Sequence, residues 1–174
     1  MTELPAALAA RPVEPRRGLP IPYVSEHDGR VDFAMLNGQR VLDCAQRRLC
    51  GQCGTPLDYW IAFVGGPAAY RQRTYSDPPG HPACMRAAVD LCPYLAIERH
   101  QRRRSDGGDV PCGFTVAQLR QVVLATTRGY RWSFDSDTGS ERAVVFTPAP
   151  FKNAVRFEYR DGVLAELGPI PIPG

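Results

Sequence analysis

Two short cysteine motifs constrain this chain more than any other feature. Cys50 and Cys53 form a C-x2-C pair inside the string CGQCG. Residues 54–80 separate them from His81 and Cys84, which form an H-x2-C pair. Structural Zn²⁺ sites take four Cys or His ligands in a tetrahedron. The motifs therefore predict that these four side chains meet at one zinc ion.

The local spacing suits that chemistry. The glycines of CGQCG let backbone N–H groups turn toward the sulfur atoms. His81 and Cys84 lie three residues apart at the start of a predicted helix, so their side chains meet on one side of its first turn. The positive end of that helix also favours anionic thiolates. With four protein ligands the predicted site is closed, which makes its role structural and not catalytic.

A redox C-x-x-C pair, unrelated to His81 and Cys84, is the alternative interpretation. Such a pair usually opens a helix after a strand, whereas a turn and a strand are predicted to follow Cys53. No pair among the remaining cysteines has ligand spacing, so buried thiols are the favoured interpretation. A second metal site that includes His100 stays open. These remaining cysteines are Cys44, Cys92 and Cys112.

Proline and glycine positions, together with periodicity, predict an α+β fold in four segments. They are an extended Pro-rich arm without a helix at 1–29, a zinc module at 30–98, a basic linker at 99–111 and a β-rich segment at 112–174 packed on the module. Inside the module, a knuckle, a hairpin and a helix carrying the last two ligands give the layout of a treble-clef zinc finger.

Apolar spacing places the elements within these segments. It predicts a strand at 30–36, a helix at about 39–49 capped by Asn37, and a helix from His81-Pro82 to about Pro93. The other predicted strands are 59–64, with a weaker hairpin partner at 68–75, and, in the C-terminal third, 120–126, 129–135, 142–148 and 154–159.

Arginine supplies almost all of the positive charge. The chain has 21 basic and 18 acidic residues and a net charge of +3, which by itself does not indicate nucleic acid binding. Its densest basic patch, with two arginines that precede the knuckle, is a candidate phosphate-binding site. A solvated linker is the favoured interpretation of that patch. The candidate nucleic-acid residues are Arg47, Arg48, Arg99, Arg102, Arg103 and Arg104.

Aromatic and histidine residues give little support for other activities. Tyr59, Trp60 and Phe63 could stack bases, but they lie in the best predicted strand and are expected in the core. A treble-clef nuclease would need a general-base histidine and an open metal site. Neither His27 nor His100 lies in such a setting, so no catalytic residue is predicted.

The sequence carries no signal for export or membrane insertion. No apolar run is long enough to span a bilayer, and the N-terminus combines Glu3 and Pro5 with no basic region, which makes it a poor signal peptide. We therefore expect a cytoplasmic protein. Cysteines in that reducing compartment are thiols or metal ligands rather than disulfides.

Three strings, RRLCGQCGTPLDYWIAFVGGP, DPPGHPACMRAAVDLCPYL and ATTRGYRWSF, resemble an uncharacterised family of small bacterial and phage-encoded proteins. Its members share C-G-x-C-G-x-P-L, an A-F-V-G-G-P-like strand, P-P-x-H-x-x-C and C-P-[YF]-L. The resemblance covers about residues 17–165. It implies no activity, but it implies a packing role for Cys92-Pro93 and zinc ligation by Cys50, Cys53, His81 and Cys84.

Together these features favour a non-catalytic, zinc-stabilised binding or scaffold protein with an unidentified protein partner, associated with a phage or mobile element. A nucleic-acid-binding protein that uses the arginine patch is the alternative. A treble-clef nuclease is the third hypothesis.

Overall fold

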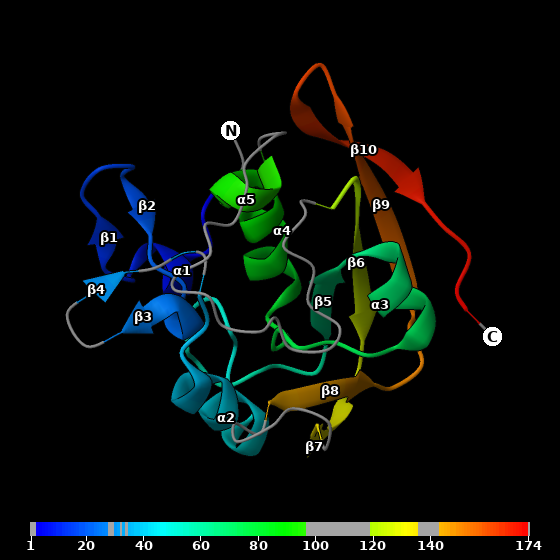
Figure 1. Cartoon of the computed structure of the whole chain (residues 1–174), viewed down its shortest axis with the longest axis horizontal. Helices are drawn as coiled ribbons and strands as arrows, with labels where there is room; N and C mark the ends of the chain where they lie inside the picture. The colour runs from blue at the N-terminus through cyan, green and yellow to red at the C-terminus, as the bar shows by residue number, and fades with distance from the viewer. Residues whose placement is uncertain are drawn as a thin grey trace.

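The computed structural model of the chain describes residues 3–27, 30–31, 33, 35–96, 119–135 and 143–173. Its centre is an antiparallel four-stranded sheet (Figure 1). The strand order is β10 (Val163–Pro169), β9 (Asn153–Arg160), β6 (Gln121–Thr127) and β5 (Ile61–Gly65). The fold is mixed α+β, as predicted, and β5 of the predicted zinc module shares this sheet with the C-terminal third.

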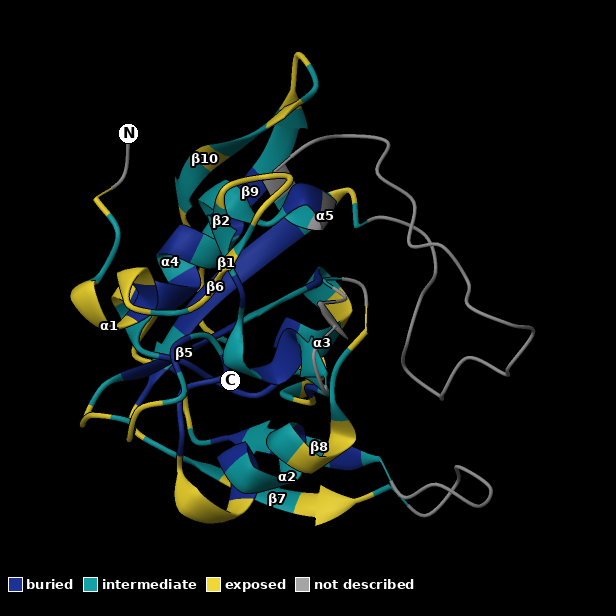
Figure 2. Cartoon of the chain, turned by 90° about the vertical axis from the view of Figure 1, so that its left-hand side faces the viewer, coloured by how far each residue is buried: buried dark blue, intermediate teal, exposed yellow. Residues whose placement is uncertain are grey.

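Both faces of the sheet are covered. Successive residues of β6 are apolar and point to opposite faces, so each face has apolar side chains to bury. Val122 and Leu124 pack on one face against helix α4 (Pro82–Leu91). On the other face, Val123 and Ala125 belong to the largest core cluster, and Figure 2 shows β6 as a buried strand. The elements covering that face are α2 (Gly38–Arg47), α3 (Pro67–Gln72), β7 (Tyr130–Phe134) and β8 (Val144–Pro148).

Strands β7 and β8 continue the β6–β9 pair around a corner. Thr127 at this corner is fully buried, and its hydroxyl donates to the carbonyl oxygens of Ala149 and Pro150 at 3.0 and 3.1 Å. The strands predicted at 120–126, 129–135, 142–148 and 154–159 are confirmed to within a few residues. Strand β10 was not predicted, and it pairs with β9 in antiparallel register, with a shift between Glu166 and Gly168.

The two helices predicted around the cysteine motifs are confirmed. The Asn37 side chain accepts hydrogen bonds from the backbone N–H groups of Gln39 and Arg40, which caps α2. Pro82 occupies the first turn of α4, and a short helix, α5 (Pro93–Ala96), follows it. Among the described residues, no helix is long and apolar enough to cross a membrane.

The predicted hairpin partner at 68–75 is wrong, because α3 occupies most of it. Pro67 begins that helix with a preset φ angle, and the residues after it are good helix formers. Gly65 and Gly66 serve close packing and not a hairpin turn. A Cβ atom on Gly65 would lie 2.7 Å from the Tyr75 ring, and one on Gly66 would lie 2.8 Å from Leu119.

The N-terminal arm has more structure than expected. The prediction of no helix is wrong, since α1 spans Ala6–Ala9. Of the strand expected at 30–36, the described residues form only Arg30–Val31, and Met35 is 45% exposed, so this residue does not face a core. The arm's other elements are β1 (Val13–Glu14) paired with β2 (Leu19–Pro20), the 3-10 turn η1 (Tyr23–Ser25), and β3 (Glu26–His27) paired with β4 (Arg30–Val31).

Candidate metal centre

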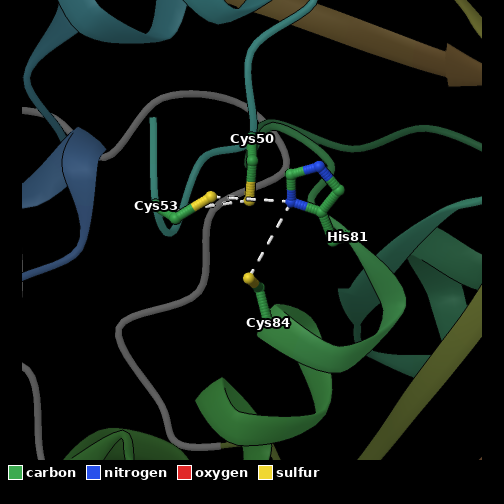
Figure 3. A group of neighbouring side chains, drawn as sticks. All are labelled: Cys50, Cys53, His81 and Cys84. Atoms are coloured by element: carbon green, nitrogen blue, oxygen red, sulfur yellow. Dashed lines mark hydrogen bonds between the residues drawn. The ribbon is translucent and has the colours of Figure 1, made fainter. Parts of the chain in front are cut away.

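The four predicted ligands converge at one point (Figure 3). One ligand atom from each of Cys50, Cys53, His81 and Cys84 lies within 4.8 Å of the others. The three cysteines are at most 5% exposed, and the histidine is half-buried. Among the described residues this is the only such group of Cys, His, Asp or Glu side chains, and it could bind a metal ion.

The first two ligands lie on a tight turn closed by a bridge between Leu49 and Pro56. The N–H of Gly54 donates to the carbonyl oxygen of Cys50 at 2.8 Å. Gly54 has a φ of +78°, a conformation that side-chain-bearing residues rarely adopt. The turn aims the N–H of Cys53 at the Cys50 sulfur, 3.5 Å away, as expected for a thiolate held by backbone donors.

The other two ligands lie at the start of α4. His81 is the N-cap residue, and its Nδ1 atom lies 3.5 Å from the Cys53 sulfur and 3.9 Å from the Cys84 sulfur. On the opposite side of the ring, Nε2 lies 3.0 Å from the carbonyl oxygen of Pro56. A carbonyl only accepts hydrogen bonds, so Nε2 carries the proton and the lone pair of Nδ1 points at the sulfurs.

Backbone contacts hold the two ligand pairs together. The N–H of Gly51 donates to the carbonyl oxygen of Pro79 at 2.9 Å. Ala62 of β5 and Gly80 exchange two backbone hydrogen bonds of 2.8 and 3.0 Å. A Cβ atom on Gly80 would lie 3.0 Å from the Cys50 sulfur and 2.7 Å from the Met85 sulfur. Glycine is therefore required there for the chain to pass so close to a ligand.

Hydrogen bonds among the three thiols shift their pKa values in opposite directions. Hydrogen bonding from Cys50 lowers the pKa of Cys53 well below its usual range, and Thr55, whose hydroxyl lies 3.1 Å from that sulfur, acts in the same direction. Hydrogen bonding within the cluster instead raises the pKa of Cys50 and of Cys84. The protein alone thus favours one thiolate of the three, and a divalent cation would stabilise the other two.

The N-terminal arm covers this turn. Leu8 of α1 is 3% exposed and packs in one cluster with Cys50, Cys53 and Cys84. Further along the arm, the N–H of Tyr23 donates to the carbonyl oxygen of Gln52 at 2.8 Å. The arm therefore provides an apolar cover on the cysteines and a hydrogen bond to the turn between them.

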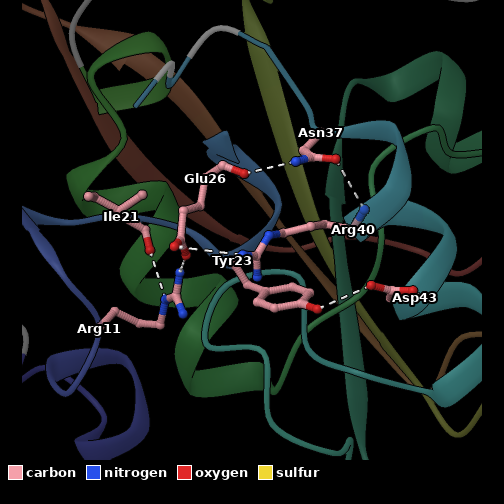
Figure 4. Close-up of polar contacts among 7 residues, drawn as sticks. All are labelled: Arg11, Ile21, Tyr23, Glu26, Asn37, Arg40 and Asp43. Carbon is pink, nitrogen blue, oxygen red and sulfur yellow. Dashed lines mark hydrogen bonds and ion pairs between the residues drawn. The ribbon is translucent and has the colours of Figure 1, made fainter. Parts of the chain in front are cut away.

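A polar network fixes Tyr23 against the turn (Figure 4). The guanidinium carbons of Arg40 and Arg11 lie 4.4 and 5.7 Å from the centre of its ring, and both arginines form ion pairs with Glu26. Hydrogen bonding from Arg11 lowers the pKa of Glu26, which keeps the carboxylate charged. A Cβ atom on Gly54 would lie 2.6 Å from the Tyr23 ring, so the two are in close contact.

The two other cysteines that the structure describes do not join the cluster. Cys44 is fully buried, which confirms that prediction, and burial raises its pKa to about 12. Cys92 is only half-buried, so the buried-thiol prediction is wrong for it. Cys112 and His100 lie outside the described residues, so the structure does not test the second metal site that would include them.

The predicted arginine patch is described only in part. Arg99, Arg102, Arg103 and Arg104 lie outside the described residues, while Arg47 and Arg48 are exposed at the end of α2. Among the aromatic candidates, Phe63 is fully buried as predicted. Tyr59 is 62% exposed and Trp60 half-buried, so the core prediction is wrong for these two residues.

Four residues that support the site were not predicted. Thr55 contacts a ligand sulfur, Pro56 orients the histidine, Gly80 allows the close approach and Leu8 covers the cysteines. Thr55 and Pro56 follow the CGQCG string directly, so a turn around the ligands could have indicated them. Leu8 and Gly80 carry no such signal, because their roles depend on tertiary contacts.

Comparison of the chain with known protein families, with curated proteins and with solved structures finds no match. The interpretation of the site therefore depends on its own geometry and chemistry.

Proposed function

We propose that the cluster binds one structural Zn²⁺ ion. With Zn–S and Zn–N bonds of about 2.3 and 2.0–2.1 Å, a tetrahedral site places a sulfur and a nitrogen ligand roughly 3.5 Å apart. The distances from His81 Nδ1 to the Cys53 and Cys84 sulfurs are 3.5 and 3.9 Å. Three thiolates and one imidazole also match the ligand preference of Zn²⁺ over the harder Mg²⁺ and Ca²⁺.

Such a site would be closed. Four protein ligands complete the tetrahedron, which leaves no position for a water molecule or substrate. The cysteines are buried, and Leu8 packs against them. The ion would therefore act on stability, where structural zinc contributes roughly 10–16 kcal/mol, more than the whole stability of many domains of this size.

The arrangement favours a treble-clef-like module in which the hairpin is reduced. The cysteine turn, strand β5 and the ligand-bearing helix α4 follow one another as in that layout. The second hairpin strand is replaced by the single bridge from Ala62 to Gly80. Helix α3 occupies the intervening chain, and β6 pairs with β5 instead.

On this basis the protein would be a non-catalytic, zinc-stabilised binding or scaffold protein, and its partner would be recognised by surfaces that the metal centre holds in place. Association with a phage or mobile element rests on the family resemblance alone. The observation that carries the proposal is the convergence of three sulfur atoms and the Nδ1 atom of His81.

Metal analysis of the purified chain tests the proposal. Elemental analysis should give about one zinc per chain, and Cys53→Ser should yield metal-free, unfolded or insoluble protein. Cys92→Ser is the matched control, because Cys92 is also on the α4 side of the fold but outside the cluster. Wild-type protein that is folded and metal-free would overturn the proposal, as would a Cys53→Ser variant with full zinc content and unchanged melting.

A further inference from the structure

We infer that an exposed aromatic and basic surface beside the metal centre binds single-stranded nucleic acid. The surface consists of Tyr59, Trp60 and Arg128, flanked by Arg48 and Lys152, and we call it the corner surface. It extends the proposed function by giving the zinc-stabilised fold a binding face. Of its three cations, only Arg48 was among the nucleic-acid candidates predicted from the sequence.

Two aromatic rings and a guanidinium group form its centre. Tyr59 is 62% exposed, and its ring lies edge-on to that of Trp60, with their centres 5.2 Å apart. The guanidinium carbon of Arg128 lies 5.6 Å from the centre of the Tyr59 ring and 5.5 Å from that of Trp60. A large exposed aromatic ring beside a cation is suited to stack on a base, whatever the sequence of the strand.

Backbone contacts bring the flanking cations to the same region. Arg48 lies opposite Leu57 on the cysteine turn, since the N–H of Leu57 donates to the carbonyl oxygen of Arg48 at 2.8 Å. Its guanidinium carbon lies 5.2 Å from the ring of Tyr130, two residues beyond Arg128. Lys152 lies at the corner between the β6–β9 and β7–β8 pairs, where its N–H donates to the carbonyl oxygen of Thr126 at 2.8 Å.

The positive charge of this surface is not neutralised within the described part of the chain. None of Arg48, Arg128 and Lys152 takes part in an ion pair there, and all three are exposed. The nearby Asp58 carboxylate is 86% exposed and lies 3.7 Å from His81 Nε2, so one negative charge stands against these three cations. A surface whose cations are not paired within the described residues favours an anionic partner.

The aromatic rings decide between the two anionic classes of macromolecule. An acidic polypeptide would pair with the arginines without needing an exposed Tyr59 ring. Single-stranded nucleic acid uses both features, because phosphates contact cations while bases stack on aromatic rings. In a duplex the bases are paired and stacked on one another, so their faces cannot stack on Tyr59, and a single strand is the expected occupant.

Binding of fluorescein-labelled oligothymidine and oligouridine, followed by anisotropy at about 50 mM salt where phosphate contacts are strong, tests this inference. Both are expected to bind more tightly than a duplex, and their relative affinities show whether DNA or RNA is preferred. Tyr59→Ala should weaken binding roughly 5- to 150-fold, the range measured for loss of one stacked base. Arg128→Glu should weaken binding and make the salt dependence shallower by about 0.7 in the logarithmic slope.

Arg160→Glu is the matched control, because Arg160 is also exposed but lies at the end of β9 remote from the corner. Zinc content is measured for each variant, so failure of the metal centre is distinguished from failure of the surface. Zinc-loaded wild-type protein that does not bind either oligonucleotide would overturn the inference. Equal affinities of Tyr59→Ala and Arg160→Glu would do so too, as would polyglutamate competing as well as unlabelled oligothymidine.

Discussion

The Nε2 atom of His81 lies 3.0 Å from the carbonyl oxygen of Pro56, and this contact determines which ring nitrogen faces the three sulfur atoms. The acceptor belongs to the same cysteine turn that supplies Cys50 and Cys53. His81, the N-cap residue of α4, is thus oriented by the cysteine turn. This contact couples the two pairs of candidate ligands before any ion binds.

The contrast between His81 and Asp58 gives a first prediction. Asp58 also approaches Nε2, at 3.7 Å, but its side chain is 86% exposed, so this ion pair should contribute little. Asp58→Asn is expected to keep its full zinc content, and its free energy of unfolding should lie within about 0.5 kcal/mol of the wild-type value. His81→Ala should lose the metal. Elemental analysis after gel filtration measures both; metal loss in Asp58→Asn would show that the Pro56 carbonyl alone does not orient the ring.

Two glycines with positive φ angles give a second prediction. Gly18 has a φ of +65° and open space around it, so Gly18→Ala should cost only backbone strain, about 1–2 kcal/mol. Gly54 has a φ of +78°, and a Cβ atom there would lie 2.6 Å from the Tyr23 ring. Gly54→Ala should therefore lower the free energy of unfolding by about 1–3 kcal/mol more than Gly18→Ala does, because its Cβ atom overpacks the contact with Tyr23. Urea unfolding of both variants measures the difference, and equal costs would contradict a tight Tyr23 contact.

Cys44 gives a prediction for alkaline pH. Burial raises its pKa to about 12 in the folded chain, against about 8.5 when unfolded. A raised folded pKa gives stability that is complete below the unfolded value and is lost as the pH rises toward the folded one. Between pH 7.5 and 10.5 the free energy of unfolding of the wild type should fall by roughly 3 kcal/mol more than that of Cys44→Ala. Urea unfolding at both pH values tests this; parallel losses would contradict it.

The cluster of four candidate ligands was predictable because it depends on local spacing. Zinc chemistry fixes the residue types, and the turn at Cys50–Cys53 and the helix start at His81–Cys84 each form within a few residues. Helix α2 was predictable for the same reason, since Asn37 caps it by contacts two and three residues away.

Two of the failures involve long-range packing. The chain after Gly66 has aromatic and apolar residues compatible with either a strand or a helix, and only the pairing of β5 with β6 shows that no hairpin partner is needed. Tyr59 belongs to an apolar run, yet β5 begins at Ile61, which leaves the ring outside the core. Position relative to a distant strand is not encoded in local periodicity.

Leu8 gives the last prediction, because it connects the N-terminal arm with retention of the metal. Its side chain is 3% exposed and packs with three of the four ligands. Leu8→Ala should lower stability by about 2–5 kcal/mol and should open a path to the sulfur atoms. Removal of zinc by a chelator, followed with a colorimetric indicator, is therefore expected to be faster in this variant than in the wild type.

Val13→Ala is the control for Leu8→Ala, since Val13 is on the same arm but 52% exposed. It should release zinc at the wild-type rate. Equal rates in the two variants would mean that zinc leaves by a route that does not require the arm to separate from the cysteine turn. A faster rate in Leu8→Ala alone would instead show that the arm, held through Tyr23 and Glu26, is part of the metal centre's barrier to dissociation.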